Sequence, residues 1–225
     1  MRTHAIEAGS SFFSAFRTAH PDLFNASGRG STRFAPVTDT RGADVPTLYG
    51  SASQTAALLE TVFHDVHAGV RPRLITNMAL RERGLVRLTT PERIVLFDLR
   101  DEALATMGLR RHQLTTTTAA HYACTQRWAS ALLDRGIGRA RPAGIVWHSR
   151  VAELARLESP LFGDLRGPTA EAFVVFGEGP VADASGRVST GAARYLPAVV
   201  ASDLMAATAL PLVAAIAREL DATLA

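Results

Sequence analysis

Lysine is missing from this chain of 225 residues, in which arginine supplies all 24 basic side chains. Cysteine occurs once, as Cys124, so no disulfide can form within the chain, and a reducing compartment is indicated. Cys124 falls in a helical pattern, which predicts a buried, unreactive thiol. No apolar run approaches the ~20 residues of a membrane span, and the first twenty residues lack the apolar block of a secretory signal. These absences predict a cytoplasmic protein without membrane contact.

The charge and composition describe an ordinary globular chain. A net charge of +3 is modest for this length and gives no reason to expect nucleic-acid binding. Hydrophobic residues make up 47% and charged residues 20%, enough to bury a sizeable core. We expect one domain over residues 12–200, preceded by a loosely held lead-in over residues 1–11. Residues 201–225 are expected to form a C-terminal helical extension of the same domain.

The order of the predicted elements indicates an α+β fold. Strands are predicted at residues 12–17, 47–51, 71–80, 84–88, 93–97, 144–149 and 171–176. Helices are predicted at residues 101–107, 119–133 and 203–220, and residues 150–167 are expected to be irregular. Pro211 is expected to kink or divide the last helix. Because the strands between residues 71 and 97 lack intervening helices, a doubly wound sheet is not expected.

A helix is also predicted directly after the strand at residues 47–51. Ser53 stands where an N-cap belongs, able to accept a hydrogen bond from the first free amides. An apolar stripe at helical spacing follows, formed by Leu59, Val62, Phe63 and Val66. Glu60 lies at the flank of this stripe, close to the buried side. An exposed helix needs no acid there, whereas a binding cleft could use one.

The glycine-rich segment at residues 28–33 superficially resembles a phosphate cradle. No helix follows it directly, although the dinucleotide fingerprint and the P-loop both require one. Rossmann and Walker sites are therefore excluded. The segment is instead expected to be a loop that presents arginine side chains, whose planar forks match phosphate oxygens.

Several short motifs occur in a fixed order: Phe16-Arg17, Arg33-Phe34-x-Pro36, Leu48-Tyr49 with Glu60 eleven residues later, and Gly-Ile-Val-Trp-His-Ser at residues 144–149. Over residues 13–176 this order resembles the RES domain family, named for an arginine, a glutamate and a serine. The resemblance implies an ADP-ribosyltransferase-like split β-sheet core flanked by helices. It also implies NAD degradation, typically by the toxin of a bacterial toxin–antitoxin pair.

The resemblance further implies a role for each motif residue. Glu60, Arg33 and Ser149 would be catalytic. Arg17 and Arg33 would clamp the pyrophosphate of NAD, Tyr49 would line the nicotinamide pocket, and Ser149 would bond a ribose or phosphate oxygen. NAD is then the substrate, with no further cofactor and no metal. The expected partner is a cognate antitoxin, and a homo-oligomer is possible.

Release of nicotinamide from NAD needs few catalytic side chains. Nicotinamide leaves NAD as a neutral molecule from a cationic ring, so no acid has to protonate it. The transition state resembles an oxocarbenium ion, which one carboxylate can stabilise, whereas ordinary glycosidases use two. Water, phosphate or a protein side chain could be the acceptor, and the sequence does not choose among them.

Other interpretations of the same residues stay open. Glu60, His64 and His67 could gather on one side of a helix as metal ligands, but nothing nearby supplies further ligands. Ser149 and His148 could belong to a hydrolase triad, but neighbouring residues on a strand point to opposite faces. Each predicted site residue also has an ordinary structural role available. A non-catalytic module that binds a nucleotide or a partner is the alternative function.

Overall fold

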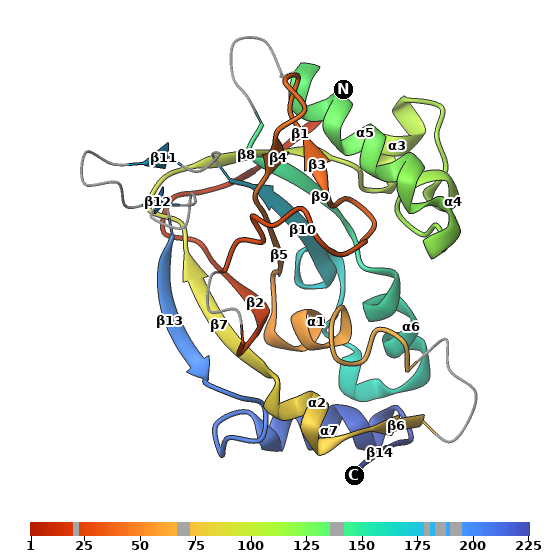
Figure 1. Cartoon of the computed structure of the whole chain (residues 1–225). Coiled ribbons are helices and arrows are strands. Elements are labelled where there is room, and N and C mark those ends of the chain that lie inside the picture. The colour runs from red at the N-terminus through yellow and green to blue at the C-terminus, as the bar shows by residue number, and fades with distance from the viewer. Residues whose placement is uncertain (20–22, 67–72, 136–141, 178–180, 183–187, 190–194) are drawn as a thin grey trace.

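The computed structural model describes residues 1–19, 23–66, 73–135, 142–177, 181–182, 188–189 and 195–225. Its centre is an eight-stranded sheet (Figure 1). In spatial order the strands are β1 (Thr3–Ile6), β8 (Ile94–Asp98), β9 (Gly144–His148), β10 (Glu171–Phe176), β5 (Thr47–Ser51), β2 (Ser11–Arg17), β7 (Arg83–Thr89) and β13 (Leu196–Ala201). Only β8 and β9 pair in parallel; the other neighbours are antiparallel.

The sheet is divided between β5 and β2. Every residue of β2 has a partner on β7, but only Phe13 has one on β5, where it lies opposite Ser51. From that point β2 and β5 diverge. The strands on the two sides of this junction then share one apolar core, in which the Phe12 ring meets the Phe173 ring edge-on at 4.9 Å. The predicted split sheet is therefore confirmed.

Two groups of helices pack against the sheet (Figure 1). The first group packs on β8, β9 and β10 around Trp147 and consists of α3 (Asp101–Thr106), α4 (Arg111–Leu114) and α5 (Tyr122–Arg135). The second group packs around Phe63 and Leu85 and consists of α1 (Gln54–Leu59), α6 (Arg150–Glu158) and α7 (Leu210–Glu219). The split in the sheet lies between the two groups.

The remaining elements are short. The helix α2 (Asn77–Arg81) adjoins α7, as does the pair β6 (Arg73–Ile75) and β14 (Ala222–Leu224). The described residues also form the 3-10 turns η1 (Ala119–His121), η2 (Pro160–Phe162) and η3 (Gly167–Ala170). Two further pairs are β3 (Val37–Thr38) with β4 (Asp44–Val45), and β11 (Val181–Ala182) with β12 (Val188–Ser189). Within the described residues, no helix has the length and hydropathy needed to cross a membrane.

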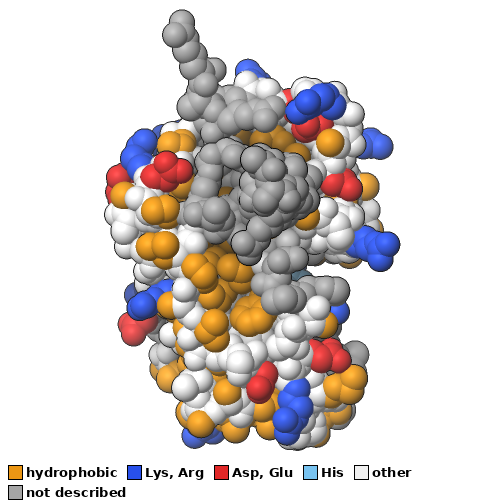
Figure 2. All heavy atoms as spheres, turned by 60° about the vertical axis from the view of Figure 1, so that its left-hand side comes forward, with side chains coloured by type: hydrophobic (Ala, Val, Ile, Leu, Met, Phe, Trp, Pro, Cys, Tyr) orange, Lys and Arg blue, Asp and Glu red, His pale blue; other side chains and the backbone are white. Residues whose placement is uncertain are grey.

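One edge of the sheet is apolar on its surface. The edge strand β13 pairs with β7 on one side only. Its Leu196 and Val199 side chains are 62% and 67% exposed. Figure 2, which turns this side toward the viewer, shows hydrophobic side chains gathered on it.

The α+β class and most predicted elements are confirmed, but the N-terminal lead-in is wrong. Residues 3–6 form β1, which pairs with β8 along its full length. The strand predicted over residues 71–80 is also too long. Residues 71 and 72 lie outside the described residues, β6 ends at Ile75, and Thr76 caps α2 through a hydrogen bond from the Ala79 amide.

Four further corrections concern helices and the residues on them. Residues 150–167 are not irregular throughout, because α6 occupies the whole first half of this segment. Pro211 does not kink a helix; it lies in the first turn of α7, where its missing N–H costs nothing. Cys124 is exposed rather than buried. The helix that begins after Ser53 ends at Leu59 instead of continuing to Val66.

Candidate active site

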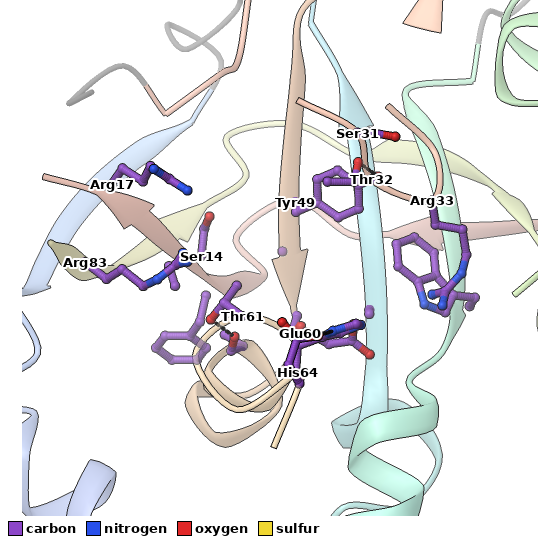
Figure 3. Close-up of a pocket in the computed structure, with 18 of the residues that line it drawn as sticks. Ser14, Arg17, Ser31, Thr32, Arg33, Tyr49, Glu60, Thr61, His64 and Arg83 are labelled. Atoms are coloured by element: carbon purple, nitrogen blue, oxygen red, sulfur yellow. Dashed lines mark hydrogen bonds and ion pairs between the residues drawn. The ribbon is translucent and has the colours of Figure 1, made fainter. Parts of the chain in front are cut away.

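A cavity of about 530 Å³ opens where β2 and β5 diverge. Four of the predicted residues line it (Figure 3): Arg17 at the end of β2, Tyr49 on β5, Arg33 in the loop before β3 and Glu60 at the end of α1. Four segments that are distant in the sequence therefore meet at the split in the sheet.

Glu60 owes its position to the early end of α1. Ser53 begins the helix by accepting a hydrogen bond from the Ala56 amide at 3.1 Å. The Thr61 hydroxyl donates to the Ala57 carbonyl at 2.7 Å, and the chain then turns, so that Phe63 and Val66 are buried from a turn rather than from a helix. Glu60 is left as the C-cap, half-buried and facing the cavity.

Within the described residues, the Glu60 carboxylate has no compensating cation. It makes no ion pair or hydrogen bond with any residue in the described part of the chain. A negative charge at a helix C-terminus also lies at the unfavourable end of the helix dipole. The protein thus holds an uncompensated carboxylate against a cavity, an arrangement that suits a positively charged ligand group.

The loop that carries Arg33 is fixed from two sides. On the β5 side, the Phe34 amide donates to the Tyr49 hydroxyl at 3.0 Å, and that hydroxyl bonds Thr32 Oγ1 at 2.8 Å. On the α5 side, Gln126 Nε2 donates to the Thr32 carbonyl at 2.9 Å, and the Thr125 hydroxyl donates to the Arg33 carbonyl. The loop therefore has little freedom, although no helix follows it.

Tyr49 stays neutral at ordinary pH. Burial raises the pKa of its hydroxyl to about 12, against smaller opposing contributions from the hydrogen bonds with Thr32 and Phe34 and from the Arg33 charge. Its ring meets the Trp147 ring edge-on, with the centroids 6.1 Å apart. The hydroxyl is thus occupied in holding the loop, and it is the ring that remains to line the cavity.

Arg33 keeps most of its hydrogen-bonding capacity. Its Nη2 donates to the Thr117 carbonyl at 3.4 Å, and its guanidinium carbon lies 5.9 Å from the centre of the Tyr122 ring. Its Nε is buried without an acceptor. No carboxylate among the described residues pairs with it. The remaining donors suit an anionic ligand group.

A second cationic group lies in the same cavity. Arg17 at the end of β2 stands directly opposite Arg83 at the start of β7, and both line the cavity. In Figure 3 these two lie on one side of Tyr49 and Arg33 lies on the other, with Glu60 between them near the end of β5. Arg83 carries no sequence signal of its own, because only the pairing of β2 with β7 brings it here.

Ser149 is not brought to this cavity. It is fully buried at the N-cap of α6, where its Oγ accepts a hydrogen bond from the Ala152 amide at 2.9 Å. Of the five residues predicted for the site, Arg17, Arg33, Tyr49 and Glu60 line the cavity and Ser149 does not.

The arrangement gives little support to a metal site. His64 lines the cavity, where its Nδ1 lies 2.9 Å from Asp65 Oδ1, but His67 lies outside the described residues. Elsewhere in the described residues, three side chains could share an ion: Asp101, His148 and Glu153. Arg111 already pairs with this group, at 3.1 Å from Asp101 and 2.7 Å from Glu153. Arg111 thus already compensates the two carboxylates of that group.

The hydrolase triad is likewise unsupported. The Ser149 hydroxyl accepts its hydrogen bond inside the α6 cap, and His148 faces Asp101 at 3.7 Å. An activated nucleophile needs a base within hydrogen-bond reach of its hydroxyl. Among the described residues, no histidine is hydrogen-bonded to Ser149.

Comparison with known proteins assigns most of the chain to one family. The sequence model of the RES domain matches residues 4–193. Among solved structures, the chain is similar to one in the crystal structure of the M. tuberculosis MbcT–MbcA toxin–antitoxin complex, with a TM-score of 0.49 and 14% sequence identity. That alignment covers 97% of this chain and 92% of the other. No curated protein matches the sequence.

Proposed function

We propose, from the premise that this chain belongs to the RES domain family, that it destroys NAD by breaking the bond between nicotinamide and ribose. The observation that carries the proposal is the half-buried Glu60 carboxylate, unpaired among the described residues and flanked on both sides by arginines without carboxylate partners. The cavity, at about 530 Å³, lies within the usual range for small-molecule sites.

Glu60 supplies the negative charge that this reaction needs. As the bond from ribose C1′ to the nicotinamide nitrogen breaks, positive charge moves onto the sugar ring, while the bond electrons neutralise the leaving pyridinium. A carboxylate fixed beside the sugar stabilises this state more than the ground state, which is the requirement for catalysis. The other acid in the cavity, Asp65, is 97% exposed and faces His64, so it is less suited to this role.

The arginines hold the rest of the dinucleotide. Arg33 carries the donors for a phosphate of the pyrophosphate group, and its loop is already fixed by Tyr49, Thr125 and Gln126. Because the loop is ordered before the ligand arrives, less entropy is lost on binding. The Tyr49 ring then limits the space left for nicotinamide.

The family also implies a biological setting. Its members are typically toxins of bacterial toxin–antitoxin pairs, so we propose that a cognate antitoxin binds this protein and that it acts in the cytoplasm, where NAD is abundant. Expression in bacteria without an antitoxin should then stop growth. The Glu60→Gln variant should relieve that toxicity, because it removes the charge and keeps the shape of the side chain.

The direct test is nicotinamide release from NAD by the purified protein, followed chromatographically with and without phosphate. We expect Glu60→Gln to lower kcat by roughly 100- to 1000-fold, the usual loss when one transition-state contact is removed. Glu102→Gln is the matched control, since Glu102 is a helix acid that is 90% exposed, pairs with Arg2 and does not line the cavity. Equal turnover in the Glu60→Gln protein would remove this carboxylate from the mechanism. Stabilisation by NAD without any turnover would instead indicate a binding module.

A further inference from the structure

The pairing of β2 with β7 creates an unusual contact. Arg17 and Arg83 are exact register partners in an antiparallel ladder. Side chains at directly opposite positions have Cβ atoms about 4.5–5.5 Å apart, and like charges there are destabilising. Within the described residues neither guanidinium has a carboxylate partner. Among the described residues, these two adjacent positive charges therefore have no ion-pair partner in the protein without ligand.

Burial increases the cost of this contact. Burial lowers the pKa of Arg83, the Arg17 charge lowers it further, and the Glu82 charge makes a smaller contribution in the opposite direction. An arginine nevertheless remains protonated at any physiological pH. The repulsion therefore cannot be relieved by losing a proton. An anion bound between the two groups would relieve it.

The direction of the two side chains shows where such an anion would bind. Both line the cavity, on the far side of Tyr49 from Arg33 (Figure 3). We infer that Arg17 and Arg83 form a phosphate-binding subsite on the cavity wall opposite Arg33. The ligand is a phosphate group, because two arginine forks can bind several oxygens of one tetrahedral dianion, whereas a carboxylate offers only two.

Two sources can supply this phosphate, and here the inference rests on the proposed function. It is either a phosphate of the dinucleotide or inorganic phosphate that acts as the acceptor. In the second case a phosphate oxygen forms the new bond to ribose C1′ as the bond to nicotinamide breaks. The products are then neutral nicotinamide and ADP-ribose 1-phosphate, and no other reactant is needed. The two arginines would also reduce repulsion between the incoming phosphate and Glu60.

Binding without turnover tests the subsite separately from catalysis. The affinities of the protein for inorganic phosphate and for ADP-ribose are measured by calorimetry in the absence of NAD. We expect Arg83→Gln to weaken one of them by at least about tenfold, as when a charge-assisted hydrogen bond is lost, and Arg83→Lys to weaken it less. Arg87→Gln is the control: Arg87 lies on β7 too and is exposed, but it does not line the cavity.

Which of the two affinities falls identifies the source of the bound phosphate group. Weaker binding of phosphate alone, with a raised KM for phosphate, indicates the acceptor; weaker binding of ADP-ribose alone indicates the pyrophosphate. Both results support the subsite, and both are independent of whether Glu60 is catalytic. Unchanged affinity for both ligands in Arg83→Gln overturns it. Should that variant fail to fold, Arg17→Gln, at an exposed strand end, gives the same test.

Discussion

Removing one oxygen atom, by Tyr49→Phe, tests whether the loop that carries Arg33 is fixed through the Tyr49 hydroxyl. The change leaves the Phe34 amide, which belongs to a fully buried residue, without its acceptor. Thr32 Oγ1 loses one partner but keeps the Ala35 carbonyl at 3.2 Å. An unsatisfied buried donor costs about 1–3 kcal/mol. For a chain of this length each kcal/mol lowers Tm by about 2–4 °C, so we expect a fall of about 2–12 °C.

The same change should reduce activity through Arg33. A loosened loop displaces the guanidinium, and small displacements of positioning groups are costly. We expect kcat/KM for NAD to fall by about 10- to 100-fold, measured by nicotinamide release, with the change in Tm followed by circular dichroism. Tyr122→Phe is the control for stability, since the Tyr122 hydroxyl makes no hydrogen bond with the described residues. A Tyr49→Phe protein as stable as Tyr122→Phe would refute the reasoning.

Two more predictions concern pH and the α6 cap. Because the pKa of Tyr49 is about 12 when folded and about 10 when unfolded, the folded state binds more protons between these values and loses stability as pH rises from about 10 to 12. Urea unfolding across that range should show a steeper loss in the native chain than in Tyr49→Phe. Ser149→Ala should cost about 1 kcal/mol, as N-cap losses do, and Ser53→Ala is its matched comparison. If Ser149→Ala abolished turnover while Ser53→Ala, at similar stability, did not, Ser149 would have a role in the site that its buried position does not suggest.

The sequence predicted those parts of the fold that depend on local patterns. The segments that form β2, β5, β9 and β10 are short apolar runs bounded by turn residues, a pattern that predicts strands. The family motifs placed Arg17, Arg33, Tyr49 and Glu60 in one site, and the structure brings all four to one cavity.

The wrong or missed predictions concern features that depend on residues distant in the sequence. The apolar stripe after Ser53 was correctly expected to be buried, but Phe63 is buried just as completely from a turn. Cys124 lies next to Thr125 on α5, and a step of one residue rotates a side chain by about 100°, so Thr125 faces the core while Cys124 faces solvent. Arg83 could not be found, because its neighbour Arg17 is supplied by another strand.

The prediction that the segment after Ser149 is irregular was wrong for a different reason. Its arginines and glutamates hide a narrow apolar side made of Val151, Ala152 and Ala155, all buried against the core around α1. Small residues give a weak signal of periodicity, although they allow close helix packing. Ser149 was predicted to bind the substrate, whereas it caps the helix that follows it.

The split in the sheet explains why a polar ligand site exists at this place. If the pairing of Phe13 with Ser51 continued, Ala15 would lie opposite Tyr49 and the ladder would fill the space that the cavity occupies. Because the strands diverge instead, backbone groups there lose their ladder partners and need water or a ligand. Next to this divergence, on β5, a Cβ atom at Gly50 would come within 2.6 Å of the Phe173 ring and 2.9 Å of the Phe12 ring. A larger residue at position 50 would force the two halves of the core apart. We therefore infer that the cavity, and the positions of the arginines that line it, depend on glycine at this one position of β5.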